Sequence, residues 1–599
     1  EGDNYHALTV LNYTHKEKID VIYIDPPYNS GNKTWKYNNN YVDPEDGYRH
    51  SKWINMMDKR LRITKNLLKK DGVLVCAIDE KELANLYLLL YDIYGGKNRR
   101  YGPYKIDIIA IVHNPRGIQG KNFSYSHEYA LFVYPNDRKK YIQDDEREGY
   151  LRNLRDNGGD SKRTSGATFY SIFVDKRTNK IIKFGAIPSE EFHPKEANIK
   201  NNGLIKIWPI DNDGVERKWR YSRSSIEKIK DDLVVKKSGN ALQVFINKNY
   251  EKYKTVWSGA KYDANEYGTK LLRRILSNSK FPYPKSIYTV LECLRAACGD
   301  KEALVLDFFA GSGTTGHAVL ELNKEDGGSR KFILCTNNEI SADEEKRFKK
   351  KHNLSSFDFD KWKKENKKKW VDFQEKNGIC SAICYPRVKK VIKGYSYKGT
   401  EKEIIWEKKI DIKELKRGDE IYKESEKVKQ RELKKDSDCK IIRSMSSKRG
   451  YIQLIKKKKI DGKKKGLGGN LQYFKTSFVK KTKNSDQLKL NLTQECTQML
   501  CVKENIFNLE KRGKDYKVFS SNKKDKFLCI YYNFIDKSFD DFLKNIKKLK
   551  GSKVVYMFSI NNTVDKRLFN GVRGFSIEAI PQQILNIYKQ LIYLNIKRK

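Results

Sequence analysis

The 599-residue sequence lacks several features that mark common classes of protein. No apolar run approaches the length that spans a bilayer, and the densest one, around Leu83 to Tyr91, is broken by Asn85. The N-terminus carries no signal-peptide pattern. The ten cysteines show no CxxC spacing and no clustered histidines. These absences favour a cytoplasmic protein with reduced cysteines and no membrane contact, and they predict neither disulfides nor a metal site.

Sequence motifs of nucleotide hydrolysis and DNA cleavage are also absent. No GK[ST] follows a glycine-rich loop, which excludes a P-loop. No PD…ExK nuclease segment and no helicase motif is evident. Any DNA cleavage linked to this chain would therefore require a partner protein.

Basic residues are present in large excess. Lysine and arginine total 122 against 76 acidic residues, which gives a formal charge of +46 spread along the chain. Such an excess indicates a polyanionic partner, and nucleic acid is the first candidate. A lysine bias from an AT-rich genome gives the same composition. Charge alone therefore does not identify the partner.

Apolar runs alternate with segments of helical spacing, which predicts an α/β fold with a doubly wound, mostly parallel, Rossmann-like sheet. The alternation stops between residues 136 and 264, resumes near Tyr267 and changes again beyond Gly394. We expect a first half of the core (1–135), an inserted domain (136–264), a second half of the core (265–398) and a small C-terminal α/β domain (399–599).

The predicted insertion combines basic and aromatic residues, including Trp208, Trp219, Arg220, Tyr221 and Trp257. This mixture suits a surface that contacts phosphates and bases. An irregular, solvated insertion is the alternative interpretation.

A glycine-rich stretch, Asp307 to Thr315, follows the predicted strand 303–306. It has the form of a strand, a tight turn and a helix N-terminus, which offers backbone N–H groups to a carboxylate or phosphate. An acid after the next predicted strand, Glu339, is placed to accept both hydroxyls of a ribose. Taken alone, this pattern fits any nucleotide-binding α/β protein.

A second motif, Asp25-Pro26-Pro27-Tyr28, follows the apolar run Ile19 to Ile24. The exocyclic amine of adenine or cytosine is a poor nucleophile, and two acceptors aimed at its N–H bonds would stabilise the charge that develops on it. The Asp25 carboxylate and the Pro26 carbonyl can supply these acceptors, and Tyr28 can stack on a base that has left the duplex. A turn that merely ends the strand is the structural alternative. If the strands before the two motifs are neighbours, target and cofactor share one crevice.

These residues resemble the S-adenosylmethionine-dependent amino-methyltransferases in which DPPY precedes the target-recognition region and FxGxG follows it. Further matching segments are similar to the modification subunit of type III restriction-modification systems. These segments are Gly2-Asp3-Asn4, Trp53 with Arg60-Leu61, Ser126 to Tyr129, Phe281 to Lys285, Phe332 to Glu339, Tyr385 to Arg387 and Gly466 to Asn470. The family usually carries more sequence before Gly2, so we expect a truncated or short variant.

The resemblance implies a role for each matched residue. On the target side, Asp25, Pro26, Pro27 and Tyr28 hold and activate the base. On the cofactor side, Phe309 packs against the adenine and Glu339 holds the ribose. The methionine end lies near Asp307, Gly311, Ser312, Gly313 and Thr314. Lys285 lies near the methionine carboxylate, and Asp3 is a further candidate for a cofactor contact. We expect His127 to be a buried, hydrogen-bonded structural histidine.

The resemblance predicts a DNA adenine N6-methyltransferase that needs no metal and acts on double-stranded DNA. It implies a homodimer and an ATP-dependent restriction subunit as partner, with the insertion recognising the target and the C-terminal domain contacting other subunits. Cytosine N4-methylation and a role mainly as a DNA-reading scaffold are the alternatives. An RNA or protein-glutamine methyltransferase fits less well, because neither explains the long basic insertion.

Overall fold

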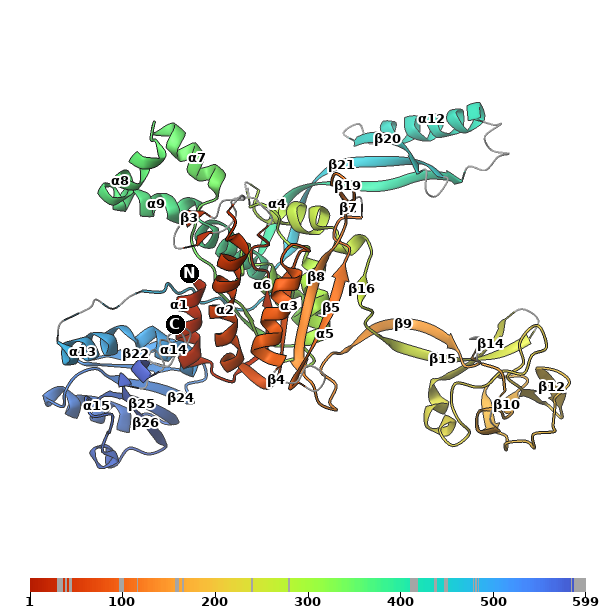
Figure 1. Cartoon of the computed structure of the whole chain (residues 1–599), viewed down its shortest axis with the longest axis horizontal. Coiled ribbons are helices and arrows are strands. Elements are labelled where there is room, and N and C mark those ends of the chain that lie inside the picture. The colour runs from red at the N-terminus through yellow and green to blue at the C-terminus, as the bar shows by residue number, and fades with distance from the viewer. Residues whose placement is uncertain are drawn as a thin grey trace. The chain divides into compact units, whose positions relative to one another are not determined.

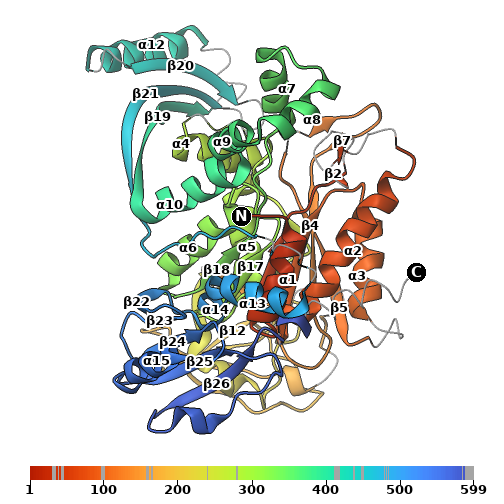
Figure 2. The same cartoon turned by 90° about the vertical axis from the view of Figure 1, so that its left-hand side faces the viewer.

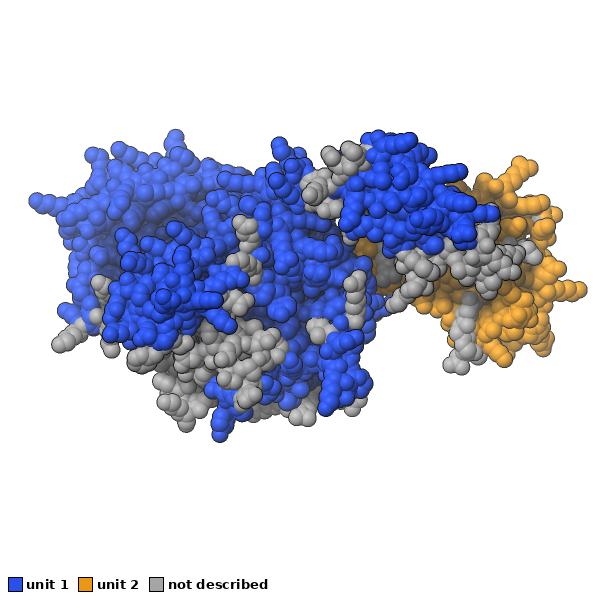
Figure 3. All heavy atoms as spheres, turned by 90° about the horizontal axis from the view of Figure 1, so that it is seen from above, with its two compact units in different colours: residues 1–142, 254–599 blue, residues 143–253 orange. Residues whose placement is uncertain are grey.

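A computed structural model gives the fold of the chain. It describes residues 1–29, 36–37, 40–41, 46–95, 102–115, 117–156, 161–163, 166–238, 241–277, 279, 281–409, 418–435, 439–446, 451–477, 479, 482, 484–582 and 584–586. The chain forms two compact units, one of residues 1–142 with 254–599 and one of residues 143–253 (Figure 3). Within the described residues, no helix combines the length and the apolar composition needed to cross a membrane.

A seven-stranded sheet forms the core of the larger unit (Figure 1). In spatial order its strands are β16 (Val256–Trp257), β5 (Tyr104–Ile111), β8 (Glu128–Pro135), β4 (Leu68–Ile78), β1 (Ile19–Ile24), β17 (Leu304–Asp307) and β18 (Lys331–Leu334). The pairs β16–β5, β4–β1, β1–β17 and β17–β18 are parallel. The prediction of an α/β fold with a mostly parallel sheet is confirmed.

Strand β8 is the exception, because it runs antiparallel to both β4 and β5. The described part of its connection to β5 contains only the short strands β6 (Ile118–Gln119) and β7 (Ser124–Tyr125). A parallel neighbour would require a longer crossover, usually with a helix. The reversal brings the first residue of β8, Glu128, to the edge where β5 ends, opposite Ile111.

Two groups of helices cover the sheet (Figure 2). Helices α1 (Asn4–Thr14), α2 (Arg49–Leu67) and α3 (Leu83–Leu90) contribute to one apolar cluster with Ile22 and Ile24 of β1. Helix α5 (Ile287–Ala297) packs on α6 (Thr314–Asp326) and contacts β1 and β4. Side chains alternate across a strand, so Val21 and Tyr23 face away from the first cluster. Both are buried, as expected of a central strand that is covered on both faces.

The remaining elements of the larger unit surround this core. Near the second half of the core lie α4 (Leu271–Ile275), α7 (Ala342–Lys351), α8 (Ser356–Glu365), α9 (Lys367–Asn377) and α10 (Tyr385–Lys393). A two-stranded ribbon consists of β2 (Lys36–Tyr37) and β3 (Asn40–Tyr41).

The residues predicted to form a C-terminal domain belong to two sheets. The first has the order β19 (Gly394–Lys409), β21 (Tyr451–Lys465) and β20 (Cys439–Ser446), and α12 (Gly418–Lys435) contacts β20 and β19. The second has the order β22 (Asn508–Arg512), β23 (Tyr516–Ser520), β24 (Lys526–Tyr531), β25 (Ser552–Phe558) and β26 (Phe575–Ile580). Its helices are α13 (Ser485–Glu495), α14 (Thr497–Glu504) and α15 (Lys537–Lys547).

The smaller unit has its own sheets and its own core. One sheet has the order β11 (Ile181–Phe184), β10 (Ile172–Asp175), β13 (Leu204–Ile207) and β12 (Asn198–Asn201), and the other has β14 (Leu233–Ser238), β15 (Ala241–Lys252) and β9 (Asp144–Asn153). Tyr170, Ile172, Trp219 and Ile246 belong to one buried cluster that both sheets share. An independent core is the usual mark of a domain.

Two predicted DNA-contacting aromatic residues of the insertion are core residues. Trp219 is 2% exposed and donates its indole N–H to the Tyr170 carbonyl at 2.7 Å. Trp208 is 7% exposed and stacks on Phe169. The interpretation of Trp208 and Trp219 as part of a surface that contacts phosphates and bases was therefore wrong, because these large side chains fill the core of the insertion.

Candidate active site

The two sequence motifs meet at the carboxyl ends of neighbouring strands. Strands β1 and β17 pair in parallel, with Val21 opposite Val305 and Ile22 opposite Leu306. Asp25 follows the last residue of β1, and Asp307 is the last residue of β17. The strand order continues to β4 on one side of β1 and to β17 on the other, which is the kind of position where open α/β sheets bind ligands. The predicted pairing of the two strands is confirmed.

A buried tryptophan holds the turn that follows β1. Two consecutive prolines fix their own φ angles and offer no backbone N–H to a sheet, so the strand ends at this point. The Pro27 carbonyl accepts a hydrogen bond of 2.6 Å from Nε1 of Trp53, a fully buried residue of α2. The position of the proline pair therefore depends on the helix beside it.

A buried carboxylate, Glu82, fixes the residue after the motif. Asn29 has a left-handed φ of 56° and donates from Nδ2 to Glu82 Oε1 at 2.6 Å. Asn85 Nδ2 donates to the other carboxylate oxygen at 2.7 Å, and His50 Nδ1 lies 2.6 Å from Oε1. Sequence reasoning did not find Glu82, because an acid just before a helix is common and its partners lie far away in the chain.

Four polar side chains form a cluster beside the first motif. Tyr28 donates its hydroxyl to Glu128 Oε2 at 3.2 Å, and the Lys285 ammonium lies 3.5 Å from Asp25 Oδ1. The same ammonium contacts Glu128 Oε2 and the Tyr28 hydroxyl, and it lies 4.4 Å from the centre of the Tyr28 ring. Glu128 is buried, and the Lys285 side chain is 10% exposed. The cofactor role predicted for Lys285 stays a prediction, and its described side-chain contacts are with Asp25 and Tyr28 of the first motif and with Glu128.

Burial and charge act against each other in this cluster. Burial raises the pKa of the Asp25 carboxyl above its ordinary value, the Lys285 ammonium opposes this rise, and the Glu128 carboxylate adds to it. Burial alone would lower the pKa of Lys285, but the two carboxylates raise it above its ordinary value. Burial, together with Asp25 and Glu128, also holds the pKa of the Tyr28 hydroxyl well above its usual range. Lys285 is therefore charged and Tyr28 is neutral near neutral pH.

The glycine loop turns through conformations that suit glycine. Gly311 has a φ of 49° and Gly313 a φ of 77°, both in the left-handed region. A Cβ atom at Gly313 would lie 3.1 Å from Cys384 Sγ and 3.2 Å from Val388 Cγ2, and one at Gly311 would lie 3.2 Å from Phe281. Space and backbone conformation thus both favour glycine at these two positions.

Asp307 ties the two ends of the loop together. Its carboxylate accepts the Phe309 backbone N–H at 2.9 Å and the Thr315 hydroxyl at 2.5 Å, and it is 2% exposed. Burial raises the pKa of this carboxyl to about 7, although both hydrogen bonds favour the charged form. The nearby Asp25 carboxylate contributes to the rise.

A buried arginine supports the loop from α10. Arg387 Nη1 donates to the Ser312 and Thr314 hydroxyls, each at 2.8 Å, and Arg387 is fully buried. Burial lowers the pKa of its guanidinium to about 10, which leaves it charged at neutral pH. Sequence reasoning included Arg387 in a matched segment but gave it no role.

Asp3 and Glu339 lie at the same edge of the sheet. Asp3 is the N-cap of α1, where its side chain accepts the Tyr5 N–H at 2.9 Å, and Arg60 lies 3.3 Å away. The flanking segment is fixed by the bond from Asn4 Nδ2 to the Phe308 carbonyl at 2.9 Å. Glu339 is partly buried beyond the end of β18, and its carbonyl accepts the Ile379 N–H. Capping alone accounts for the position of Asp3.

His127 has the hydrogen-bond contact expected of it but is only partly buried, so the prediction of a buried histidine was wrong. Its Nε2 atom lies 2.9 Å from the Tyr129 hydroxyl, and the two rings meet edge to face. The next residue, Glu128, reaches the cluster at Tyr28. Glu128, and not His127, is therefore the residue of the matched segment Ser126 to Tyr129 that contacts Tyr28.

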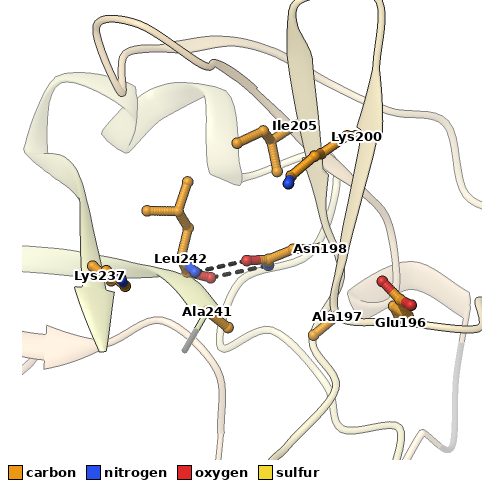
Figure 4. Close-up of a pocket in the computed structure, with 8 residues that line it drawn as sticks. All are labelled: Glu196, Ala197, Asn198, Lys200, Ile205, Lys237, Ala241 and Leu242. Atoms are coloured by element: carbon orange, nitrogen blue, oxygen red, sulfur yellow. Dashed lines mark hydrogen bonds between the residues drawn. The ribbon is translucent and has the colours of Figure 1, made fainter. Parts of the chain in front are cut away.

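A separate pocket of about 400 Å³ lies within the smaller unit (Figure 4). The Asn198 side chain bonds the backbone of Leu242 in both directions, accepting its N–H at 2.6 Å and donating to its carbonyl at 3.1 Å. Lys200 and Lys237 contribute to the wall. The pocket contains none of the predicted site residues.

Comparisons with known proteins match the chain to DNA methyltransferases. The sequence profile of the family described as DNA methylase (N6_N4_Mtase) matches residues 19–351. The type II methyltransferase M.KpnI of Klebsiella pneumoniae is 31% identical over 359 residues, which cover 56% of this chain and 79% of that protein. The EcoPI Mod subunit of a type III restriction-modification enzyme, from Escherichia phage P1, is 27% identical over 57% of each chain. The StyLTI Mod subunit of Salmonella typhimurium is 28% identical over 56% of this chain and 51% of its own.

The chain spans about half the length of these two Mod subunits. Among solved structures, the M1.HpyAVI–SAM complex matches with a TM-score of 0.26 and 13% identity, covering 56% of this chain and 91% of that one. The strand order of this chain, and not this structural likeness, establishes its fold. The family profile covers more than half of the chain and includes both motifs, so the chain belongs to the N6_N4_Mtase family of DNA methylases.

Proposed function

We propose that the chain is a site-specific adenine N6-methyltransferase that transfers a methyl group from S-adenosylmethionine to a flipped adenine of double-stranded DNA. The observation that carries this proposal is the position of the two motifs at the carboxyl ends of the paired strands β1 and β17. A ligand bound at each motif would share one crevice.

The glycine loop fits the cofactor. Any Cβ atom at Gly311 or Gly313 would narrow the cradle, the space beside these two glycines. Gly313 is the N-cap of α6 and has no side chain that could bond the N–H groups at the start of the helix. Phe309 is partly exposed within the loop, where it can pack on an adenine ring. Ser312, Thr314 and Asp307 belong to the same loop, and Glu339 is proposed to hold the ribose. The resemblance also implies Lys285 near the methionine carboxylate and Asp3 as a weaker candidate for a cofactor contact. The bound cofactor supplies a methyl group on a positively charged sulfur.

The first motif is proposed to hold the target amine. The Asp25 carboxylate and the Pro26 carbonyl accept its two N–H bonds, which stabilises the positive charge that the nitrogen gains during transfer. Pro27 keeps this backbone rigid through its bond with Trp53. Tyr28 supplies a ring on which the extruded base stacks. Flipping is required because the amine lies inside the duplex.

Adenine is favoured over cytosine by the spelling of the motif, since Asp and not Ser stands at its first position. The test incubates DNA with the chain and S-adenosylmethionine labelled in its methyl group, followed by nucleoside analysis of the product. We expect N6-methyladenine to carry the label. N4-methylcytosine as the only labelled nucleoside would overturn the adenine assignment, and no labelled nucleoside would overturn the function.

We also propose that the chain is the modification subunit of a type III restriction-modification system in the cytoplasm of a prokaryotic cell. Three Mod subunits of 25–28% identity support this reading. A homodimer and an ATP-dependent restriction subunit are the proposed partners, with residues 399–599 as the contact region and residues 136–264 recognising the target. Co-purification of the full chain with a restriction subunit encoded nearby tests this part, and failure to bind any such subunit would count against it.

A further inference from the structure

Three separate parts of the chain bring the polar cluster at Tyr28 together. Asp25 and Tyr28 follow β1, Glu128 begins β8, and Lys285 lies just before α5. Glu128 reaches this edge only because β8 is antiparallel to its neighbours. A cluster assembled from three distant segments is a feature of the fold and not of local sequence.

The backbone around Lys285 is tightly fixed. A Cβ atom at Gly268 would lie 2.1 Å from the Pro284 carbonyl oxygen and 3.0 Å from that of Lys285, so only glycine allows this approach. Ser286 is buried and donates its hydroxyl to the Lys261 carbonyl at 2.8 Å. The buried helix α5 begins at the next residue. The direction of the Lys285 side chain is therefore set by its surroundings.

The charges of the cluster balance around one ammonium. The Glu128 carboxylate is buried and the Asp25 carboxylate is partly buried, and like charges in such a place repel. The Lys285 ammonium lies against both and over the face of the Tyr28 ring. It holds an N–H donor at the Asp25 carboxylate, the group that is proposed to accept from the target amine.

We propose that Lys285 and Glu128 are positioning residues of the methyl-transfer site, in which Glu128 holds the Lys285 ammonium and Lys285 keeps the Asp25 carboxylate charged and in place. This inference rests on the proposed function. It assigns Lys285 to the target side of the crevice, in contrast to the methionine carboxylate implied by resemblance. Glu128, which lies in the matched segment Ser126 to Tyr129, gains a role that the resemblance did not assign to it.

Several titratable groups surround Asp25 and enter any account of its pH dependence. Tyr23 of β1, Tyr28, Glu128 of β8, Lys285 and Asp307 of β17 interact with Asp25 itself. His113 after β5 and Cys293 of α5 interact with Glu128 and Lys285. Lys285 is the cation that directly contacts Asp25 among the described residues. Removing Lys285 and removing Glu128 should therefore change the proton affinity of Asp25 in opposite directions.

The test measures kcat against pH for the full chain, with saturating DNA and S-adenosylmethionine. In Lys285→Met the loss of a positive charge favours protonated Asp25, so we expect the acidic limb of the profile to move to higher pH by about half a unit or more. In Glu128→Gln the loss of a negative charge has the opposite effect, and the limb should move to lower pH. Lys285→Arg should return the limb toward that of the unchanged chain.

The matched control is Lys261→Met. Lys261 pairs with buried Glu292 of α5 at 2.6 Å, so this variant also removes a lysine–glutamate pair near α5. We expect its acidic limb to stay in place, because Lys261 is not among the groups in contact with Asp25. A shift equal to that of Lys285→Met would overturn the proposal, since it would reveal a general effect of pair loss.

Binding of S-adenosylhomocysteine, followed by calorimetry, is the second readout. We expect Lys285→Met and Glu128→Gln to retain the affinity of the unchanged chain within about threefold. A loss of tenfold or more in Lys285→Met, with its acidic limb unmoved, would assign Lys285 to the cofactor and overturn the proposal. Acidic limbs that move in the same direction in Lys285→Met and Glu128→Gln would also overturn the proposal.

If Lys285→Met is inactive at every pH, the pH profiles of Glu128→Gln and Lys285→Arg test the proposal instead. The labelled nucleoside made by the unchanged chain tests the proposed function separately.

Discussion

The buried carboxyl group of Asp307 makes the stability of the folded chain depend on pH. In the folded chain its carboxyl is 2% exposed and has a pKa of about 7, against an ordinary value of 3.8. The folded state therefore holds a proton that the unfolded state releases at lower pH. A raised carboxyl pKa favours the folded chain in acid, and this contribution is lost as the pH rises from about 4 to about 7.

Asp307→Asn should remove this pH dependence. We expect the difference in free energy of unfolding between variant and unchanged chain to move in favour of the variant between pH 4 and pH 7, by up to about 4 kcal/mol. Thermal unfolding of the cofactor-free proteins at several pH values measures it. A difference that does not change with pH would contradict the buried, protonated state of Asp307.

Glu128 and Glu82 show what sequence reasoning missed at this scale. Both are buried acids whose partners lie far away in the chain, Tyr28 for Glu128 and Asn29 for Glu82. Glu128 lies in the matched segment Ser126 to Tyr129, but neither acid was given a role, because that role depends on which segments are neighbours in the fold. Asp25 and Asp307, in contrast, follow apolar runs directly, so their positions could be predicted.

At the level of elements, helix α6 begins and ends with glycines of similar backbone conformation. Gly313 at its N-cap has a φ of 77° and Gly327 at its C-cap a φ of 69°. A Cβ atom at Gly313 would press on Cys384 and Val388, whereas nothing lies within 4 Å of one at Gly327. A comparison of substitutions at the two positions therefore distinguishes backbone strain, which both would cause, from steric contact with Cys384 and Val388, which only a substitution at Gly313 would cause.

Gly313→Ala should weaken cofactor binding, and Gly327→Ala should not. Each substitution forces alanine into a left-handed conformation, at about 1 kcal/mol or more. Only the first also displaces the loop, so we expect the affinity for S-adenosylhomocysteine to fall about tenfold in Gly313→Ala, which corresponds to about 1.4 kcal/mol. Equal affinities of the two variants, measured by calorimetry, would remove the loop from the cofactor site.

Strand positions were more predictable than strand directions. The runs before Asp25 and Asp307 lie within buried strands of the expected sheet, because apolar periodicity reports burial on both faces. The reversal of β8 depends on a connection without a crossover helix. Trp208 and Trp219 were misread for a similar reason, since composition cannot tell whether an aromatic ring fills a core or faces a ligand.

At the scale of the whole molecule, the chain segment that separates two strands of the seven-stranded sheet forms a second compact unit with an apolar core of its own. The chain leaves the sheet after β8 and returns as β16, which pairs with β5 through Val256 and Ala110. Residues 143–253 form the compact unit between these strands. The two motifs are thus separated in sequence, but the strands β1 and β17 that lead to them are adjacent in the sheet.

The central claim is that one crevice holds the target amine at Asp25 and the cofactor at the glycine loop. The measurement that tests it most directly compares methyl transfer to DNA with S-adenosylhomocysteine binding in Asp25→Ala. We expect the single-turnover transfer rate to fall at least about a hundredfold, as for the loss of one transition-state partner, while cofactor affinity stays within about threefold. Equal loss of both, or transfer at nearly the unchanged rate, would contradict the account.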